Sequence, residues 1–204
     1  MNKRAALRGI GLLSVAVLSS GILVACSEDK PQFNAIDLTG ADYAKDFALA
    51  DPQGRTRTLA DFRGKVVAMF FGYTHCPDFC PTTMAELAQV KQSLGAEGKR
   101  LQAIFVTVDP ERDTAENLKS YVSAFDPEFV ALRPENEQQL SALAKDFKVY
   151  YKKVEGKSPG SYTMDHSAGM YLYDPQGRLR LYTRYGTDPQ ALASDIRLLL
   201  KQAG

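Results

Sequence analysis

Two continuous apolar runs, at residues 65–73 and 101–109, are rich in β-branched and aromatic side chains. Runs of this kind are typical of strands that are buried on both faces of a sheet. Each run is followed by a segment whose apolar residues recur at helical spacing, at residues 81–94 and 113–125. Pro81 suits the first position of the earlier helix, because the N–H that proline lacks has no partner there. The pattern predicts two successive strand–helix units.

The remaining elements follow from the same patterns and from turn residues. They are, in chain order, a hairpin at residues 46–59, a short strand at 128–134, a helix at 135–147, an extended segment at 148–156, a hairpin at 168–186 and a terminal helix at 188–202. The same pentapeptide, DPQGR, supplies the turn of both hairpins. Together these elements predict an α/β fold with a central mixed β-sheet, flanked by helices and preceded by an N-terminal β-hairpin.

The N-terminal residues have the layout of a secretory signal peptide, in which Lys3, Arg4 and Arg8 precede an apolar stretch at residues 10–24. This stretch is short for a membrane span of about 20 apolar residues; an uncleaved N-terminal anchor helix is the alternative. It ends in LVAC, which resembles the lipobox of bacterial lipoproteins, where the peptide is removed and the cysteine takes a lipid. Cys26 is therefore predicted to carry the lipid and to anchor an extracytoplasmic protein to a membrane, facing the periplasm.

The predicted domain organisation is a signal peptide at residues 1–25, a lipid-anchored flexible tether at 26–45 and one globular domain at 46–204. Loss of the first 25 residues leaves 179 of 204 and, with three basic side chains gone, changes the formal net charge from +1 to about −2. A near-neutral charge without a basic block argues against a nucleic-acid partner.

Two cysteines remain after the lipidated one, Cys76 and Cys80. Three roles are open for them: a redox pair, a metal site or a structural disulfide. A structural disulfide is disfavoured, because a domain of this length buries a sufficient core and the closed loop would be very short. The pair lies at a strand-to-helix turn, where helix N-terminal amides lower thiol pKa values and favour both nucleophilic attack and metal ligation.

The position at the end of a central strand is where the thioredoxin superfamily carries its redox site. Thioredoxin-type oxidoreductases have a two-residue spacer between the cysteines, whereas here the spacer has three residues. They also carry a proline just before a later strand. The corresponding stretch of this chain, YTMDHSAGMYLY, has no proline and has His166 instead. A peroxiredoxin would need a threonine-containing active-site pattern that THCPDFC does not show.

Three segments, GYTHCPDFCPTTMAEL, VTVDPERDT and DHSAGMYLYDPQG, resemble in this order the Sco/SenC family of copper-binding assembly proteins. The resemblance spans residues 47–199 and implies a thioredoxin-like fold. It implies that Cys76, Cys80 and His166 bind copper, as Cu(I) and also Cu(II), and deliver it to the dinuclear copper site of cytochrome c oxidase. The implied partners are the copper-bearing oxidase subunit, a thiol reductant and another copper carrier.

The residue chemistry agrees with this resemblance, because two thiolates and an imidazole form a soft, low-coordinate set suited to Cu(I). Structural zinc usually takes four protein ligands, and His75 adjoins Cys76 too closely to share its ion. A lone histidine such as His166 is also commonly a buried residue that is satisfied by hydrogen bonds. The competing function is an extracytoplasmic thiol-disulfide reductase, in which Cys76 and Cys80 are a catalytic redox pair and His166 is dispensable.

Two carboxylates are predicted to support the site from outside the ligand set. Asp165 adjoins His166, and metal-bound imidazoles usually donate their other N–H to a carboxylate or carbonyl. Asp109 lies at the carboxyl end of a strand, where α/β sheets gather functional groups. For Asp109 the alternative is a turn that caps the next helix.

Overall fold

The computed structural model of the chain describes residues 32–202, and its centre is a six-stranded sheet with the strand order β1-β10-β9-β4-β5-β6. β4 (Val66–Gly72) lies in the middle, parallel to β5 (Leu101–Thr107) on one side and antiparallel to β9 (Met170–Tyr173) on the other. All seven residues of β4 and of β5 are buried, as their apolar runs predict. The central mixed sheet predicted from the sequence is confirmed.

The other elements surround these three strands. The remaining strands are β1 (Ile36–Asp37), β2 (Leu49–Ala50), β3 (Thr56–Arg57), β6 (Val130–Leu132), β7 (Tyr151–Glu155), β8 (Tyr162–His166) and β10 (Leu179–Thr183). The helices are α1 (Phe79–Ser93), α2 (Ala115–Ser123), α3 (Glu137–Asp146) and α4 (Pro189–Lys201), with short 3-10 helices at Leu59–Phe62 and Gly95–Arg100. Each helix predicted from the apolar spacing is present.

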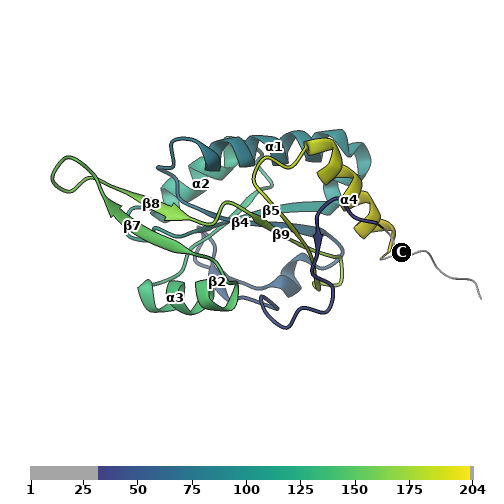
Figure 1. Ribbon diagram of the computed structural model, residues 1–204, viewed down its shortest axis with the longest axis horizontal. Coiled ribbons are helices and arrows are strands. Elements are labelled where there is room, and N and C mark those ends of the chain that lie inside the picture. Colours follow the sequence, from purple (N-terminus) through teal and green to yellow (C-terminus); the bar gives the residue numbers. More distant parts are fainter. Residues whose placement is uncertain (1–31, 203–204) are drawn as a thin grey trace, which may run out of the picture. The chain divides into compact units, whose positions relative to one another are not determined.

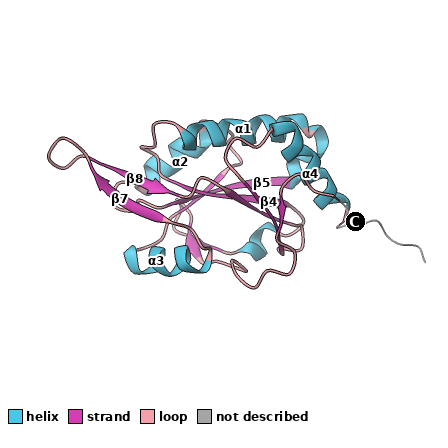
Figure 2. Cartoon of the chain, viewed as in Figure 1, coloured by secondary structure: helices cyan, strands magenta, loops and turns pink. Residues whose placement is uncertain are grey.

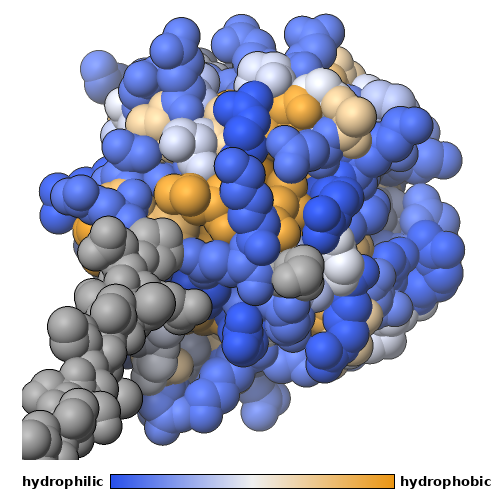
Figure 3. All heavy atoms as spheres, turned by 90° about the vertical axis from the view of Figure 1, so that its right-hand side faces the viewer, coloured by the Kyte–Doolittle hydropathy of each residue, from blue (hydrophilic) through white to orange (hydrophobic). Residues whose placement is uncertain are grey.

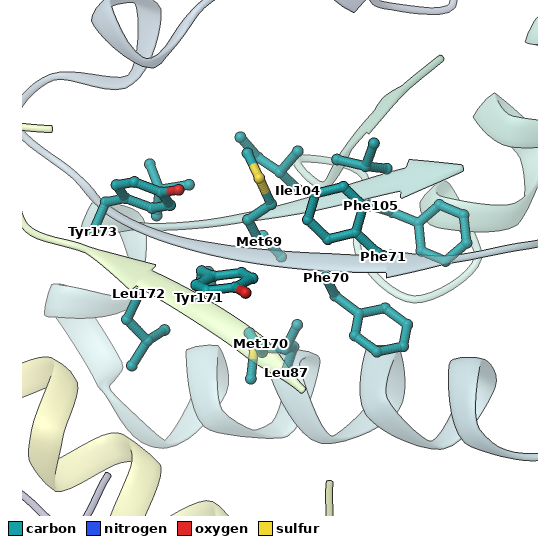
Figure 4. Packing of buried hydrophobic residues seen from close by; sticks show 14 of the residues in the cluster. Met69, Phe70, Phe71, Leu87, Ile104, Phe105, Met170, Tyr171, Leu172 and Tyr173 are labelled. Atoms are coloured by element: carbon teal, nitrogen blue, oxygen red, sulfur yellow. The ribbon is translucent and has the colours of Figure 1, made fainter. Parts of the chain in front are cut away.

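Helices cover both faces of the sheet, with α1 and α4 on one face and α3 on the other (Figures 1 and 2). The alternation of side chains along β4 explains this arrangement. Phe70 points toward α1 and lies beside Leu87, whereas Met69 lies on the opposite face (Figure 4). Phe71, next along the strand, packs edge-on against Phe147 at the end of α3, with ring centroids 5.3 Å apart. Both faces of β4 are therefore part of the hydrophobic core.

The two DPQGR turns adopt the same structure. Asp51 and Asp174 each accept hydrogen bonds of 3.0 Å from the backbone N–H groups two and four residues later. Gly54 and Gly177 have φ angles of +75° and +74°, which residues with a side chain rarely adopt. The two copies form the β2–β3 and β9–β10 hairpins, as predicted.

The segment before β2 differs from the prediction. β1 pairs with the edge strand β10, and the buried carboxylate of Asp195 accepts hydrogen bonds from the backbone N–H groups of Asn34 (2.9 Å) and Ala35 (2.8 Å). The tether predicted at residues 26–45 is therefore wrong from Asn34 onward, because scattered apolar residues in a polar context gave no periodic signal. The predicted signal peptide at residues 1–25 and the lipidated Cys26 lie outside the described residues.

A third hairpin, β7–β8, forms a two-stranded sheet of its own that projects from the domain at the left of Figure 1. The sequence predicted β7 as an extended segment but gave no strand at β8, since YTMDH has no apolar run and its alternation of apolar and polar residues spans only five positions. In the ladder, Tyr151 pairs with His166. The hairpin therefore places His166, the last residue of β8, at the edge of the main domain.

The surface at the α4 end of the domain, turned toward the viewer in Figure 3, is mostly hydrophilic around a smaller group of hydrophobic side chains. No helix within residues 32–202 is long and apolar enough to cross a membrane.

Candidate metal centre

Cys80 lies in the first turn of α1, directly over the end of β4. The helix begins at Phe79, two residues before Pro81, so the prediction that the proline takes the first helical position is wrong by two residues. The side chain of Cys80 is fully buried. A Cβ atom at Gly72, the last residue of β4, would lie 2.7 Å from Cys80 Sγ. The absence of a side chain at Gly72 therefore allows the sulfur to approach the strand end.

The loop that carries Cys76 is fastened by Asp113, a buried residue in the turn before α2. One carboxylate oxygen of Asp113 accepts a 2.6 Å hydrogen bond from the Thr74 hydroxyl, and the other accepts one of 3.1 Å from the Thr74 backbone N–H. The hydroxyl of Thr107, at the end of β5, donates a further 2.6 Å hydrogen bond to this carboxylate. Asp113 lies in the same DPERD turn as Asp109 and carries no local sequence signal of this role.

His166 completes the group from β8. Its Nε2 atom lies 3.6 Å from Cys80 Sγ, and its Nδ1 atom lies 3.0 Å from the carbonyl oxygen of Ser167. With Nδ1–H donating to that carbonyl, the lone pair of Nε2 faces the sulfurs. The ligand atoms of Cys76, Cys80 and His166 all lie within 4.8 Å of one another. The fold thus gathers the three residues that the sequence singled out, although the histidine is 86 residues after Cys80.

Two aromatic rings fix the plane of the imidazole. Tyr73 packs edge-on against His166 with ring centroids 5.8 Å apart and an interplanar angle of 89°. Phe70 does the same from β4 at 6.1 Å and 73°. His75, the other histidine of the chain, has a half-exposed side chain and lies against Thr74 and Asp113 rather than in this group.

The two thiols share a proton unequally. A hydrogen bond from Cys80 lowers the pKa of Cys76 far below the ordinary thiol value, against the opposing effect of burial. The same hydrogen bond raises the pKa of Cys80, and so does burial. Cys76 is therefore the thiolate of the pair at neutral pH and Cys80 the proton donor. A metal ion that binds both sulfurs must displace this proton.

A hollow of about 360 Å³ opens beside the sulfurs and has Cys76 and His166 in its wall. Phe79 and Tyr150 are also part of the wall, and their side chains are 43% and 57% exposed. Exposed apolar side chains that gather beside a hollow commonly mark an interaction site. The site is thus reached from one side through an aromatic rim.

The two predicted supporting carboxylates lie in different surroundings. Asp165 is exposed, pairs in register with Lys152 and, like His166, lines the hollow. The Ser167 carbonyl, not Asp165, is the acceptor at His166 Nδ1, and a supporting role of Asp165 stays a prediction. Asp109 is buried and accepts a 2.5 Å hydrogen bond from Nε of Arg112.

The SCO1/SenC family model matches residues 37–201 of the chain. The chain belongs to the SCO1/SenC family. Among curated relatives, the mitochondrial SCO2 homologue of Bos taurus is 38% identical over 154 residues, 74% of this chain and 58% of the relative. An SCO2-like protein of Rickettsia felis is 33% identical over 148 residues, 72% of each chain. The chain thus spans less than two thirds of the bovine relative's length.

Solved structures of SCO1/SenC proteins share the fold. Copper-bound ScoI of Bradyrhizobium japonicum is 39% identical with a TM-score of 0.68, covering 76% of this chain and 97% of that protein. Copper-bound yeast Sco1 is 31% identical with a TM-score of 0.68, covering 76% and 87%. Apo Sco1 of Thermus thermophilus is 35% identical with a TM-score of 0.71, covering 85% and 98%. The predicted thioredoxin-like fold and the predicted family are both confirmed.

Proposed function

We propose that this protein binds one copper ion through Cys76, Cys80 and His166 and delivers it to the copper-bearing subunit of cytochrome c oxidase. The observation that carries the proposal is the convergence of the three ligand atoms within 4.8 Å. Copper-bound structures of two family members, from B. japonicum and yeast, support copper as the metal.

The residues of the site fit copper. Thiolate and imidazole are soft and borderline ligands, and three of them suit Cu(I), while Cu(II) accepts the same set with one further ligand. Zinc in a structural site takes four protein ligands, and the group found among residues 32–202 has three. The small coordination number leaves one side of the ion facing the hollow.

Delivery follows from that open side. Cys76 and His166 line the hollow, whereas Cys80 is fully buried. Ligands of an acceptor that enters the hollow meet Cys76 and His166 first, so the ion leaves Cys80 last. Phe79 and Tyr150 at the rim offer apolar surface to the acceptor, and another copper carrier loads the site by the reverse exchange.

A thiol-disulfide reductase remains the second candidate, favoured by the low pKa of Cys76 beside a buried, protonated Cys80. The Cys76 thiolate would attack an acceptor disulfide and release one acceptor thiolate, which takes up a proton. Cys80, giving up its proton, would then displace the second acceptor thiol from the mixed disulfide. The acceptor gains two electrons, the Cys76–Cys80 disulfide forms, and an external thiol reductant restores the pair.

The two functions differ in their need for His166, and this difference provides the test. The reduced protein is titrated anaerobically with Cu(I) against a competing chelator, alongside the Cys76→Ala and His166→Ala variants. Copper delivery predicts one tightly bound copper per chain and weaker binding in both variants. A His166→Ala protein that retains both copper affinity and full activity in oxidase assembly would contradict copper delivery and leave the reductase.

The cellular position is part of the proposal. The signal-peptide pattern and the LVAC sequence support removal of residues 1–25 and lipidation at Cys26, which would hold the domain at a membrane facing the periplasm. The anchor raises the effective concentration of the domain near membrane-bound acceptors. A Cys26→Ser protein is expected in the soluble fraction; continued membrane attachment would favour an uncleaved anchor helix instead.

A further inference from the structure

Arg112, in the turn after β5, makes contacts that converge on β8. Its Nε donates a 2.5 Å hydrogen bond to Asp109, and its Nη1 donates one of 2.9 Å to the backbone carbonyl of Tyr162. The guanidinium carbon lies 3.5 Å from the centre of the Tyr162 ring and 5.7 Å from that of Tyr73. Arginine can combine such directed hydrogen bonds with stacking on aromatic rings, whereas lysine cannot.

Asp109 bonds to both of the other side chains in this group, Arg112 and Tyr162. Its second carboxylate oxygen accepts a 3.0 Å hydrogen bond from the Tyr162 hydroxyl, and the carboxylate is buried. Carboxylate, guanidinium and phenol therefore form one cluster that ties the first residue of β8 to the turn after β5. Asp109 is the buried member and Arg112 and Tyr162 are partly exposed, so the ion pair and the two further hydrogen bonds define the geometry of the cluster.

The cluster matters for His166 because β8 is not a strand of the main sheet. β7 and β8 pair only with each other among the described strands, so side-chain contacts add to the chain connections in holding the hairpin against the domain. Tyr162 begins β8 and His166 ends it. A strand held firmly at its first residue presents its last residue in a defined direction.

A second route connects the same guanidinium to the imidazole. Tyr73, which lies under Arg112, is buried and packs edge-on against His166. Arg112 thus contacts both the strand that carries the histidine and the ring that sets its plane. We propose that Arg112 is a positioning residue that, with Asp109 and Tyr162, holds His166 toward the cysteine sulfurs. This inference rests on the proposed function only for its copper readout.

Two measurements on the Arg112→Lys variant test the proposal. Loss of an interaction that orients a metal ligand typically costs about 10- to 100-fold in metal affinity, so Cu(I) affinity is expected to fall about tenfold. Introduced into the His166→Ala protein, the same substitution should change affinity less than about twofold, because the residue it positions is gone. In the metal-free protein, amide hydrogen exchange at residues 162–166 should accelerate.

Arg180→Lys is the matched control, because Arg180 also contacts a carboxylate, Asp174, and an aromatic ring, Phe33, away from the cysteines. It should leave copper affinity and exchange in β8 unchanged. Equal affinity losses for Arg112→Lys with and without His166 would overturn the proposal, as would unchanged exchange in β8. If the unmodified protein binds no Cu(I), the proposed function fails, and the exchange measurement alone decides the role of Arg112.

Discussion

Gly72 is the residue at which the backbone of β4 meets the metal-binding sulfur. A Cβ atom there would lie 2.7 Å from Cys80 Sγ and 2.9 Å from the rings of Phe70 and Phe105. Because all three neighbours belong to the buried core, none can give way without repacking. The glycine is thus required by the close approach of Cys80 rather than by an unusual backbone angle.

The Gly72→Ala variant is expected to lose about 1–3 kcal/mol of unfolding free energy from overpacking and to bind Cu(I) more weakly. Chemical denaturation and competitive copper titration measure the two effects. Gly98→Ala is the control, since its Cβ would lie 2.2 Å from the Lys91 carbonyl, remote from the sulfurs. It should lower stability alone, and an equal loss of copper affinity there would refute the steric account.

The unequal sharing of a proton predicts an unusual pH dependence at Cys76. Because its pKa is lowered, Cys76 stays a thiolate below the ordinary thiol pKa of about 8.5. Its alkylation rate in the metal-free protein should therefore change little between about pH 8 and about pH 6, where an ordinary thiol slows roughly tenfold per pH unit. The Cys80→Ala variant lacks the main cause of the lowered pKa, so its rate should fall with pH; a pH-independent rate there would contradict the assignment.

The metal ligands were predictable from the sequence, whereas the residues that hold the ligand-bearing loop and strand in place were not. Cys76, Cys80 and His166 stand in short motifs whose residue types reveal their chemistry. Asp113 acts through tertiary hydrogen bonds to Thr74, 39 residues earlier, and no local pattern encodes such a contact. Arg112 likewise has the sequence context of an ordinary turn residue, because its contacts with Tyr162 of β8 are tertiary.

At the scale of elements, the loop between β4 and α1 depends on the Thr74–Asp113 contact. Thr74→Val removes the hydroxyl that donates to Asp113 and leaves a buried carboxylate with one fewer donor. Hydrogen bonds to charged groups contribute about 1.5–3 kcal/mol each, so a loss of unfolding free energy of this order is expected in denaturant titrations. Thr82→Val is the control, because the Thr82 hydroxyl donates to a carbonyl on the exposed surface. Similar losses for both would contradict a special role of the buried contact.

The elements that sequence patterns missed are those without a core of their own. β4 and β5 are predicted by their apolar runs, because both faces of each strand are buried. β8 belongs to a two-stranded hairpin with alternating half-buried and exposed residues, and β1 has only two residues, both exposed. Such strands form because of their pairing partners. β8 pairs with β7 across a loop, and β1 pairs with β10, which is distant in the sequence.

In the domain as a whole, the folded part begins before residue 46, the first residue of the domain predicted from the sequence. A chain that begins at residue 46 lacks the backbone groups that donate to Asp195 and the buried Ala44. Because hydrogen bonds to a buried carboxylate contribute about 1.5–3 kcal/mol each, its melting temperature should be at least about 5 °C lower than that of a chain beginning at residue 32. Equal melting temperatures would mean that residues 32–45 are a tether after all.

Two sulfurs and one imidazole nitrogen are proposed to hold a single copper ion in this protein. X-ray absorption spectroscopy at the copper edge of the Cu(I)-loaded protein measures the ligand set directly. The predicted spectrum has two sulfur ligands and one nitrogen ligand, with the imidazole scattering lost in the His166→Ala variant. A sulfur-only environment in the unmodified protein, or a spectrum that His166→Ala leaves unchanged, would contradict the assignment.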